Sequence, residues 1–400
     1  MKPSGKTSYI RQYLFGLLST FWHIFKKQKK HLIVFTAFHG DGYRGNTKIL
    51  YEQLQNDSEL EVIWLTRNKA LAQQLKSQFG QRRVALTHSI NGLNHLASAG
   101  AILLTHGTDD YPFMHLPRRA EIIQTYHGLP TKRGEYMRPK SDKPPWAFHK
   151  LILEYRFNPI DYFLSSSEIV TDIFSQRFGI DKSKFVLTGY PAYDEMTDGK
   201  KTNSDLQSLF PGLPDFTHVI LYAPTFRKKS TTKWFPFDDY NPSEINRFLE
   251  EYEAVLILRP HPNEKIIIND FSTLGDRVVQ GDQSKIENIN DLLKMTDCIV
   301  TDYSGIYIEG LLLDIPSVFI PYDLNEYERG LPLPYDDVTP GPKVQRQTEF
   351  INALKISLND TEKFKTERSR VRKLFFEAQS NNATNSTIKF LKTILLKEWL

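Results

Sequence analysis

Two histidines in this sequence directly follow predicted buried strands, where an imidazole could act as a general base or bind phosphate. His127 follows the predicted strand Glu121–Tyr126 and precedes a Gly-Leu-Pro turn. His261 follows Ala254–Leu258 and has a proline on each side, which restricts its backbone. Imidazole titrates near neutral pH, so either side chain could take a proton from a hydroxyl. The alternative interpretations are a buried histidine that caps a loop and an exposed histidine in a proline-rich turn.

Residues suited to binding phosphate or a nucleotide lie beside both histidines and beside a third strand end. Lys132 and Arg259 could form charge-assisted hydrogen bonds to a diphosphate. Thr301–Gly305 leads from a strand into an apolar helix, where backbone N–H groups and the helix dipole could face an anion. Ordinary helix N-capping by Asp302 or Ser304 is the alternative. The candidate residues of this group are Lys132, Thr225, Arg259, Thr301, Asp302, Ser304, Gly305 and Glu309.

The elements that would position these residues alternate between short β-rich strings and helical patterns. In the first half the predicted strands are Leu32–Phe38, Leu60–Thr66, Ala101–Thr105, Glu121–Tyr126 and Asp161–Ser165. The predicted helices there are Thr47–Gln55, Ala70–Phe79 and Ser167–Phe178. This alternation is typical of a doubly wound parallel sheet.

The alternation of strands and helices restarts after residues 190–214. This stretch is rich in Gly, Pro, Asp, Lys and Asn, and we interpret it as a linker. The predicted strands are then Val219–Ala223, Ala254–Leu258, Arg277–Gln280, Cys298–Thr301 and Ser317–Ile320, and the predicted helices are Glu244–Glu251, Asn288–Met295 and Gly305–Leu313. We therefore expect an α/β fold with two Rossmann-like domains facing across a cleft, residues 32–200 and 201–360. Residues 361–400 are expected to be C-terminal helices, interrupted by the polar patch Ser380–Ser386.

Composition narrows the class of protein. The 400 residues carry a net charge of only +4, which does not indicate a nucleic-acid-binding protein. The single cysteine, Cys298, cannot form an intrachain disulfide, which fits a reducing compartment. The sequence has no Asp-x-Asp pair and no cluster of metal-ligand residues, so we expect neither a dedicated metal site nor a cofactor.

The N-terminal residues 1–31 form a predicted amphipathic helix followed by a basic run. Its apolar stripe consists of Ile10, Leu14, Leu17, Leu18, Phe21, Trp22 and Phe25, and Lys26–Lys30 follow at once. The apolar run is shorter than the ~20 residues needed to cross a bilayer. We expect this helix to lie on an anionic membrane surface at its cytoplasmic face, as a peripheral anchor. Packing on the fold, or self-association, is the alternative.

An ordered set of short motifs resembles the CDP-glycerol glycerophosphotransferase family, the teichoic-acid primases and polymerases. The motifs are His39–Asn46, Thr125–Gly128 with Lys132, Gly189–Pro191, Tyr222–Thr225, Arg259–Pro262, Thr301–Ser304 and Pro321–Leu324. They span roughly residues 32 to 330, and the order is more specific than any single string.

This resemblance implies a glycosyltransferase-B architecture and a CDP-activated polyol phosphate donor. It implies that His127 is the base and that His261 contacts the donor phosphates. The N-terminal domain would then bind the acceptor, a lipid-linked saccharide or growing polymer, with Gly42, Arg44 and Asn46 on the acceptor side. The expected activity is transfer of glycerol phosphate, or a related polyol phosphate, in teichoic-acid or capsule-type polymer synthesis.

Two other functions remain open at this point. A nucleotide-sugar glycosyltransferase of the same fold would attack an anomeric carbon instead of phosphorus. A non-catalytic membrane-bound assembly protein could keep the fold without turnover, although both motif histidines are retained.

Overall fold

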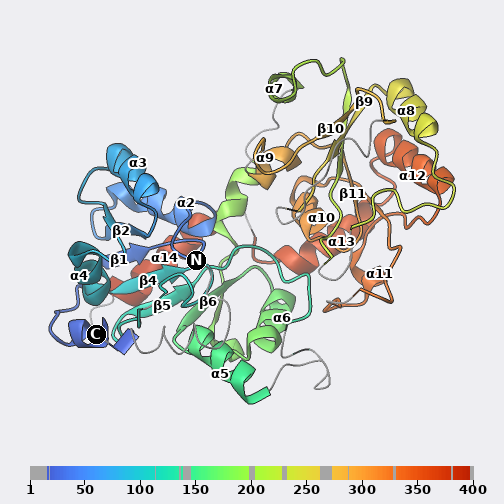
Figure 1. Cartoon of the computed structure of the whole chain (residues 1–400). Coiled ribbons are helices and arrows are strands. Elements are labelled where there is room, and N and C mark those ends of the chain that lie inside the picture. Colours follow the sequence, from blue (N-terminus) through green and yellow to red (C-terminus); the bar gives the residue numbers. More distant parts are fainter. Residues whose placement is uncertain are drawn as a thin grey trace. The chain divides into compact units, whose positions relative to one another are not determined.

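The computed structural model describes residues 16–396 except 18, 113, 135–136, 138–145, 198–202, 228–231, 262–272, 287, 328–329 and 380–381. The chain forms two compact units (Figure 1). Unit 1 consists of residues 1–129, 134–195 and 376–400, and unit 2 of residues 130–133 and 196–375. The short segment Pro130–Arg133, which follows the His127 loop, therefore belongs to unit 2.

Unit 1 is built on a parallel sheet with strand order β3-β2-β1-β4-β5-β6-β7. Its strands are β1 Leu32–Phe35, β2 Glu61–Thr66, β3 Val84–Leu86, β4 Ala101–Leu104, β5 Glu121–Gln124, β6 Tyr162–Ser165 and β7 Phe185–Leu187. The central strands are fully apolar because helices cover both faces of such a sheet. The order changes direction at β1 and β4, so the loops after β1, β4 and β5 lie together at one edge.

The helices of unit 1 begin at side-chain caps and end at glycines in several places. They are α2 Asn46–Gln53, α3 Lys69–Phe79, α4 Ile90–Ser98, α5 Trp146–Phe157, α6 Glu168–Phe178 and the C-terminal α14 Ala383–Leu396. Ser167 caps α6 by accepting a hydrogen bond from the Val170 N–H, and Gly179 closes it in the left-handed conformation.

Unit 2 repeats the plan with a parallel sheet of order β10-β9-β8-β11-β12. Its strands are β8 His218–Tyr222, β9 Ala254–Leu258, β10 Val278–Gln280, β11 Cys298–Thr301 and β12 Ser317–Phe319. Its helices are α7 Asn203–Leu209, α8 Pro242–Glu251, α9 Ile289–Leu293, α10 Ile306–Gly310, α11 Tyr335–Val338, α12 Gln347–Asn359 and α13 Lys365–Phe376. Two parallel sheets confirm the predicted α/β class with two Rossmann-like domains.

Several elements differ from the sequence prediction. The first strand ends at Phe35 rather than Phe38, because Phe38 and His39 adopt left-handed backbone angles that a strand excludes. The edge strands β3 and β7 were not predicted; they are only three residues long. The helix predicted over 305–313 is α-helical only from Ile306 to Gly310 and continues as a 3-10 turn.

The stretch 190–214, predicted as a linker, contains regular structure. A 3-10 helix covers Pro191–Thr197 and α7 lies further along, and the boundary between units falls after Glu195. The last helix begins at Ala383, inside the predicted interruption, because the Asp194 carboxylate accepts hydrogen bonds from the N–H groups of Ala383 and Thr384. This cap comes from a residue distant in the sequence, which explains why the prediction of an interruption over Ser380–Ser386 was wrong at Ala383–Ser386. The same contact binds α14 to unit 1.

The described part of the N-terminal helix comprises residues 16–17 and 19–24 (Figure 1). Its polar face packs on the rest of unit 1. Ser19 and His23 are buried, and Ser19 exchanges hydrogen bonds with the backbone of His115. Arg119 donates hydrogen bonds to the carbonyls of His23 and Lys26. Burial beside His115 and Arg119 lowers the pKa of His23 to about 4, so it packs as a neutral ring.

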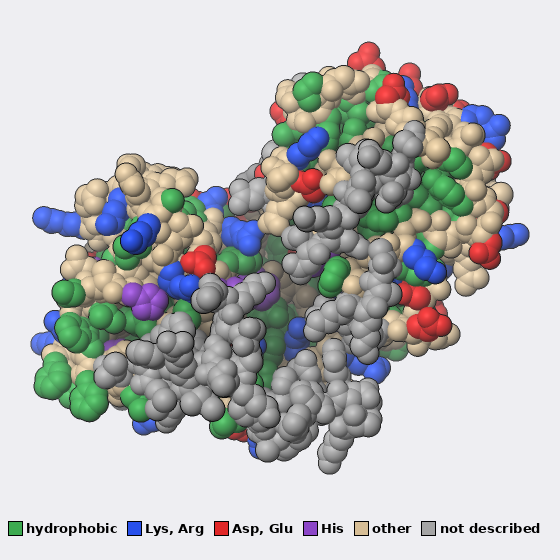
Figure 2. Space-filling view, viewed as in Figure 1, with side chains coloured by type: hydrophobic (Ala, Val, Ile, Leu, Met, Phe, Trp, Pro, Cys, Tyr) green, Lys and Arg blue, Asp and Glu red, His purple; other side chains and the backbone are tan. Residues whose placement is uncertain are grey.

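The opposite face of this helix is apolar and faces solvent. Its exposed side chains are Leu17, Phe21, Trp22, Ile24 and Phe25. Figure 2 shows hydrophobic side chains at the lower left, where Figure 1 places this helix. The other members of the predicted stripe, Ile10, Leu14 and Leu18, lie outside the described residues. No helix in the described part of the chain combines the length and apolar character that a bilayer span requires.

Candidate active site

His127 follows β5 at the edge of the unit 1 sheet where the order reverses. Its ring is exposed to solvent, and its Nδ1 atom lies 3.0 Å from the carbonyl oxygen of Thr105, the residue after β4. A carbonyl only accepts hydrogen bonds, so Nδ1 carries the proton and Nε2 keeps its lone pair. The unprotonated Nε2 atom is therefore available to an incoming hydroxyl, which is the geometry that a general base requires.

A second imidazole, that of His106, lies flat against His127. The ring centroids are 3.8 Å apart and the planes differ by 3°. Thr105 also holds this ring, since its hydroxyl oxygen is 2.8 Å from the His106 Nδ1 atom. His39, in the loop after β1, adds a third imidazole; its ring centroid lies 4.3 Å from that of His106. His106 was not among the residues predicted for the site, although its position immediately after the predicted strand Ala101–Thr105 was a signal that could have identified it.

A buried carboxylate, Asp110, organises the loops that carry these rings. Its oxygens accept hydrogen bonds from the backbone N–H groups of Thr105 (2.6 Å), His106 (3.0 Å) and His39 (2.6 Å), and from the Thr105 hydroxyl (3.0 Å). Complete burial raises the pKa of Asp110, and these backbone donors oppose that shift. Asp110 thus connects the loops after β1 and β4 through one side chain.

The backbone around the cluster is strained. Phe38 (φ 49°), His39 (φ 63°) and Tyr126 (φ 57°) all have left-handed angles without being glycine. Each such residue costs on the order of 1–3 kcal/mol, and such residues concentrate at functional sites. Tyr126 directly precedes His127, and its ring packs 4.2 Å from the imidazole. The fold therefore expends stability to hold His127 in this orientation.

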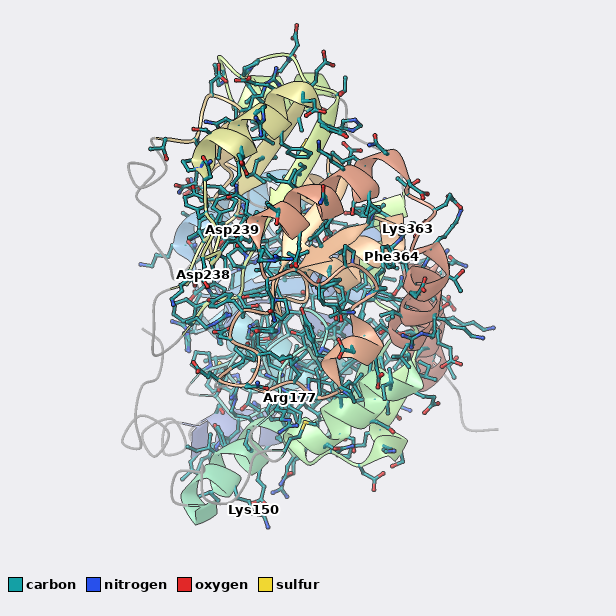
Figure 3. The ribbon with its side chains drawn as sticks, turned by 90° about the vertical axis from the view of Figure 1, so that its right-hand side faces the viewer. Lys150, Arg177, Asp238, Asp239, Lys363 and Phe364 are labelled. Carbon is teal, nitrogen blue, oxygen red and sulfur yellow. The ribbon has the colours of Figure 1, made fainter. Side chains whose placement is uncertain are left out.

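The electrostatic surroundings keep both imidazoles neutral. His127 keeps access to solvent, but its contact with Thr105 is partly buried; partial loss of hydration is the main cause that lowers the pKa of His127, and the hydrogen bond to Thr105 partly restores it. Arg177 on α6 (Figure 3), His39 and Arg156 lower it further. Burial lowers the pKa of His106 far below its usual range, and the neighbouring His127 adds to that shift. At neutral pH the pair is uncharged and carries two free lone pairs.

The three residues predicted on the acceptor side, Gly42, Arg44 and Asn46, have different surroundings. Asn46 is buried; its amide donates to the carbonyl of Thr125 at 3.0 Å, and its oxygen accepts from the N–H of Ala192. Arg44 is exposed, with its guanidinium 3.9 Å from the Phe38 ring centroid. Gly42 faces Phe38 too closely for any side chain, because a Cβ atom there would meet Phe38 at 2.9 Å.

In unit 2, Asp302 is engaged in structural contacts. The Arg227 guanidinium donates to Asp302 at 2.8 Å and to both oxygens of Asp323 at 2.8 Å, and all three groups are largely shielded from solvent. The N–H of Thr225 donates to Asp302 at 2.8 Å. Burial acts to lower the pKa of Arg227, but its hydrogen bonds to Asp323 and the charge of Asp302 raise it overall. Arg227 therefore connects the strand ends after β8, β11 and β12.

Arg227 lies two residues after the Tyr222–Thr225 motif and was not among the residues predicted for the site. Three tyrosine rings surround its guanidinium, each 5.2 Å away, from Tyr303, Tyr322 and Tyr327. The sequence did offer one signal: Arg227 lies close to a predicted strand end, and two later motifs contain Asp302 and Asp323, which could pair with it. Nothing in it showed that these residues would pair with one another.

The residues around His261 are partly committed to the backbone. One Arg259 nitrogen, Nη1, donates to the carbonyls of Gly281 (2.7 Å) and Ile286 (2.8 Å), and burial lowers the pKa of Arg259. His261 is half-buried, and its ring packs 5.1 Å from that of Phe226. The remaining guanidinium nitrogens and the His261 ring are the parts that could reach a ligand.

The strand ends of β8 and β11 also hold the other predicted donor-binding residues. Thr301 donates its hydroxyl proton to the carbonyl of Ala223 at 2.7 Å. Within the described residues, the buried hydroxyl oxygen of Thr225 has no hydrogen-bond partner. Gly305 has no room for a side chain, because a Cβ atom there would meet the Thr131 methyl group at 2.7 Å. Ser304 at the same turn is half-buried.

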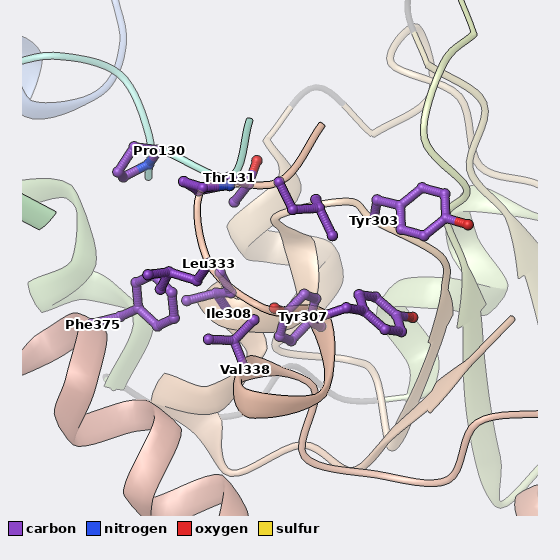
Figure 4. A pocket seen from close by; sticks show the side chains of 11 residues that line it. Pro130, Thr131, Tyr303, Tyr307, Ile308, Leu333, Val338 and Phe375 are labelled. Atoms are coloured by element: carbon purple, nitrogen blue, oxygen red, sulfur yellow. The ribbon is translucent and has the colours of Figure 1, made fainter. Parts of the chain in front are cut away.

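The Pro130–Arg133 segment is fixed on unit 2 by backbone contacts. The N–H of Arg133 donates to the Gly330 carbonyl at 3.2 Å, and its Nε atom donates to the Leu331 carbonyl at 2.7 Å. A pocket of about 350 Å³, including space open to solvent, lies beside this segment (Figure 4). It is lined by Pro130, Thr131, Tyr303, Tyr307, Ile308, Leu331, Pro332, Leu333, Tyr335, Val338 and Phe375. Lys132 and the half-buried Glu309 are near neighbours in sequence of these lining residues.

Within the described residues, no group of three or more His, Cys, Asp or Glu side chains could hold a metal ion.

Comparison with known proteins identifies the family of this chain. The sequence profile described as CDP-Glycerol:Poly(glycerophosphate) glycerophosphotransferase matches residues 18–393. The chain belongs to this family. Membership makes it an enzyme of the phosphotransferase class that uses a CDP-activated polyol phosphate in teichoic-acid synthesis, and it confirms the resemblance found in the motifs.

Individual relatives agree with this assignment. The teichoic acid glycerol-phosphate transferase of Staphylococcus aureus is 28% identical over 357 residues, covering 85% of this chain and 87% of that protein. The teichoic acid poly(glycerol phosphate) polymerase of Bacillus subtilis is 26% identical over 341 residues, covering 82% of this chain but only 44% of the polymerase.

Solved structures agree in fold. A structure of the wall teichoic acid polymerase TagF matches with a TM-score of 0.74 at 19% identity, covering 98% of this chain and 99% of that one. A UDP-GlcNAc 2-epimerase from Neisseria meningitidis matches with a TM-score of 0.55 at 14% identity, covering 90% and 99%.

Proposed function

We propose that this enzyme transfers glycerol phosphate, or a related polyol phosphate, from a CDP-activated donor to a hydroxyl of a lipid-linked saccharide or growing polymer. The observation that carries the proposal is the exposed His127 ring, whose Nδ1 proton is bound by the Thr105 carbonyl. This leaves Nε2 unprotonated at the strand end where the family motif lies. Similarity to transferases and polymerases of teichoic acid supports the choice of substrates.

In the proposed reaction the acceptor hydroxyl oxygen attacks the β-phosphorus of the donor. His127 Nε2 takes the hydroxyl proton, the bond from the β-phosphorus to the bridging oxygen breaks, and CMP leaves with the bonding electrons. His261, Lys132 and the free nitrogens of Arg259 stabilise negative charge on the diphosphate. Asp302 supports this site indirectly, since its oxygens bind Arg227 and backbone N–H groups.

The proposed place of action is the cytoplasmic face of the membrane. The N-terminal helix presents Phe21 and Phe25 outward while its polar face is bound to unit 1; Trp22 is partly exposed, and its Nε1 atom donates a hydrogen bond to Asn94. Lys26 and Lys27 follow directly and suit an anionic lipid surface, where each basic residue contributes about 1 kcal/mol. A lipid-linked acceptor diffuses in that plane, so attachment raises the local concentration of enzyme near its substrate.

The experiment is product analysis with matched variants. The protein is incubated with CDP-glycerol, CDP-ribitol or UDP-sugars and a panel of lipid-linked acceptors, and released CMP is measured. His127→Ala should lower kcat by roughly 10²–10⁴ with little change in donor affinity, whereas His261→Ala should weaken donor binding measured by calorimetry. His218→Ala, at the start of β8, is the control. Transfer from UDP-sugars instead of CDP-polyols, or a fully active His127→Ala protein, would overturn the proposal.

A further inference from the structure

His106 and His127 present two hydrogen-bond acceptors side by side, and only one of them has a role in the proposed reaction. The Thr105 hydroxyl has a single proton, which it donates to Asp110 at 3.0 Å. It can therefore only accept at its contact with the His106 Nδ1 atom, so Nδ1 of His106 is protonated. Both rings thus have the same tautomer, with an unprotonated Nε2 atom.

Both Nε2 atoms lie on the edge of their ring that is turned away from Thr105. The ring planes are parallel within 3°, and both Nδ1 edges are directed at Thr105, so the Nε2 edges lie away from it. The His127 ring is exposed, and 15% of the His106 side chain remains accessible. In the described part of the chain, no residue hydrogen-bonds either Nε2 atom.

The charged groups around the pair favour retention of His106 as an acceptor during the reaction. When His127 takes a proton, a second positive charge on a ring 3.8 Å away would be strongly unfavourable. Arg44, Arg156 and His39 also act against a charge on His106. Two carboxylates lie against this cluster. Asp109 is paired with Arg156, and Asp110 lies 3.8 Å from the His106 Nδ1 atom but already accepts hydrogen bonds from three backbone N–H groups.

We propose that His106 is a specificity-determining residue: its Nε2 atom accepts a hydrogen bond from the hydroxyl adjacent to the one that His127 deprotonates. Two neighbouring acceptors on one face match two O–H donors on adjacent carbons. The acceptor terminus is accordingly a 1,2-diol, as at the end of a glycerol phosphate unit or on a saccharide ring. This inference rests on the proposed function and specifies the acceptor chemistry of the same site.

The test compares two synthetic acceptors that differ by one hydroxyl. One is a lipid-linked saccharide ending in glycerol phosphate, and the other ends in 3-hydroxypropyl phosphate, which keeps the primary hydroxyl but lacks its neighbour. With CDP-glycerol as donor, the wild-type enzyme should prefer the diol by about ten-fold in kcat/KM, the effect of one hydrogen bond. His106→Phe keeps a flat ring against His127 but removes the acceptor nitrogen, so the preference should fall to near unity.

His95→Phe, the same substitution on α4 of unit 1, is the matched control and should keep the full preference. A wild-type enzyme without preference would overturn the proposal. So would a preference that survives in His106→Phe, because the second hydroxyl would then be bound elsewhere.

A second measurement uses the wild-type protein alone. Diethyl pyrocarbonate acylates unprotonated imidazole nitrogen, and peptide mass spectrometry identifies each modified histidine. Glycerol 3-phosphate should protect His106 and His127 together, whereas 3-hydroxypropyl phosphate should protect His106 less. Equal protection of His106 by both compounds would contradict the proposal even if His106→Phe does not fold. Absence of transfer from CDP-glycerol to either acceptor would instead contradict the proposed function, while the protection pattern still decides the role of His106.

Discussion

Replacement of Asp110 by Asn tests the most heavily bonded group of the site. The substitution preserves shape but leaves one oxygen where there were two. The carboxylate oxygen Oδ2 serves the N–H groups of Thr105 and His106, while Oδ1 serves that of His39. The asparagine oxygen will therefore take the Oδ2 position, and its NH₂ group will face the His39 N–H as donor against donor.

The expected cost follows from this arrangement. One hydrogen bond to a charged group is lost, worth about 1.5–3 kcal/mol, and one buried N–H remains unsatisfied, at about 1–3 kcal/mol. We expect the free energy of unfolding to fall by about 2.5–6 kcal/mol in total. Asp172→Asn removes an exposed carboxylate paired with Lys182 and should cost less than about 1 kcal/mol.

Urea unfolding followed by circular dichroism measures both values, and steady-state transfer from CDP-glycerol measures the effect on catalysis. Because Asp110 fixes the loop that carries Thr105, we expect kcat to fall by about ten-fold at temperatures where Asp110→Asn remains folded. A loss of stability no greater than that of Asp172→Asn would refute the argument that one carboxylate connects the two loops.

Three further predictions follow from the charges and exposed groups. The pKa of His127 is lowered, so the ring should stay unprotonated and kcat/KM should be constant through neutral pH. Protonation of His127 should make kcat/KM decline with unit slope only below the ordinary histidine pKa of about 6.5. A decline centred at or above that pH would contradict a neutral His127. Arg227→Lys should cost about 3–5 kcal/mol in urea unfolding because lysine cannot bridge both buried carboxylates, whereas the exposed Arg247→Lys should be neutral within about 0.5 kcal/mol, and equal values would be contrary evidence. The double variant Phe21→Asp with Phe25→Asp should stay folded yet fail to co-sediment with anionic liposomes, and unchanged sedimentation would exclude this face as the membrane contact.

The strands and the first candidate base could be predicted because their signals are local. Runs such as Ala254–Leu258 are apolar without interruption, and His127 follows the predicted strand Glu121–Tyr126, of which Glu121–Gln124 forms β5. The edge strands β3 and β7 were not predicted because three residues are too few to show a repeating pattern of apolar side chains. The first strand was predicted three residues too long because nothing in the residue types at Phe38 reveals a left-handed backbone.

The partnerships at the site could not be predicted because they depend on the order of strands in space. His106 and His127 meet because β4 and β5 are neighbours, and Asp110 reaches His39 because β1 borders β4. Asp302 was predicted to bind the donor, yet its charge is matched by Arg227, 75 positions earlier in the chain. A sequence shows which residues end strands, but not which of those ends share an edge.

The return of the last helix to the first unit has a consequence for biosynthesis. Lys392 on α14 forms ion pairs with Asp57 and Glu59, each at 2.7 Å, and Asp194 caps the helix start. Unit 1 therefore lacks the packing of α14 until residues 383–396 have been synthesised, whereas the last segment of unit 2 ends at Phe375. The expected order of cotranslational folding is the reverse of the order of synthesis, and the apolar sheet of the first-made half depends longest on chaperone protection.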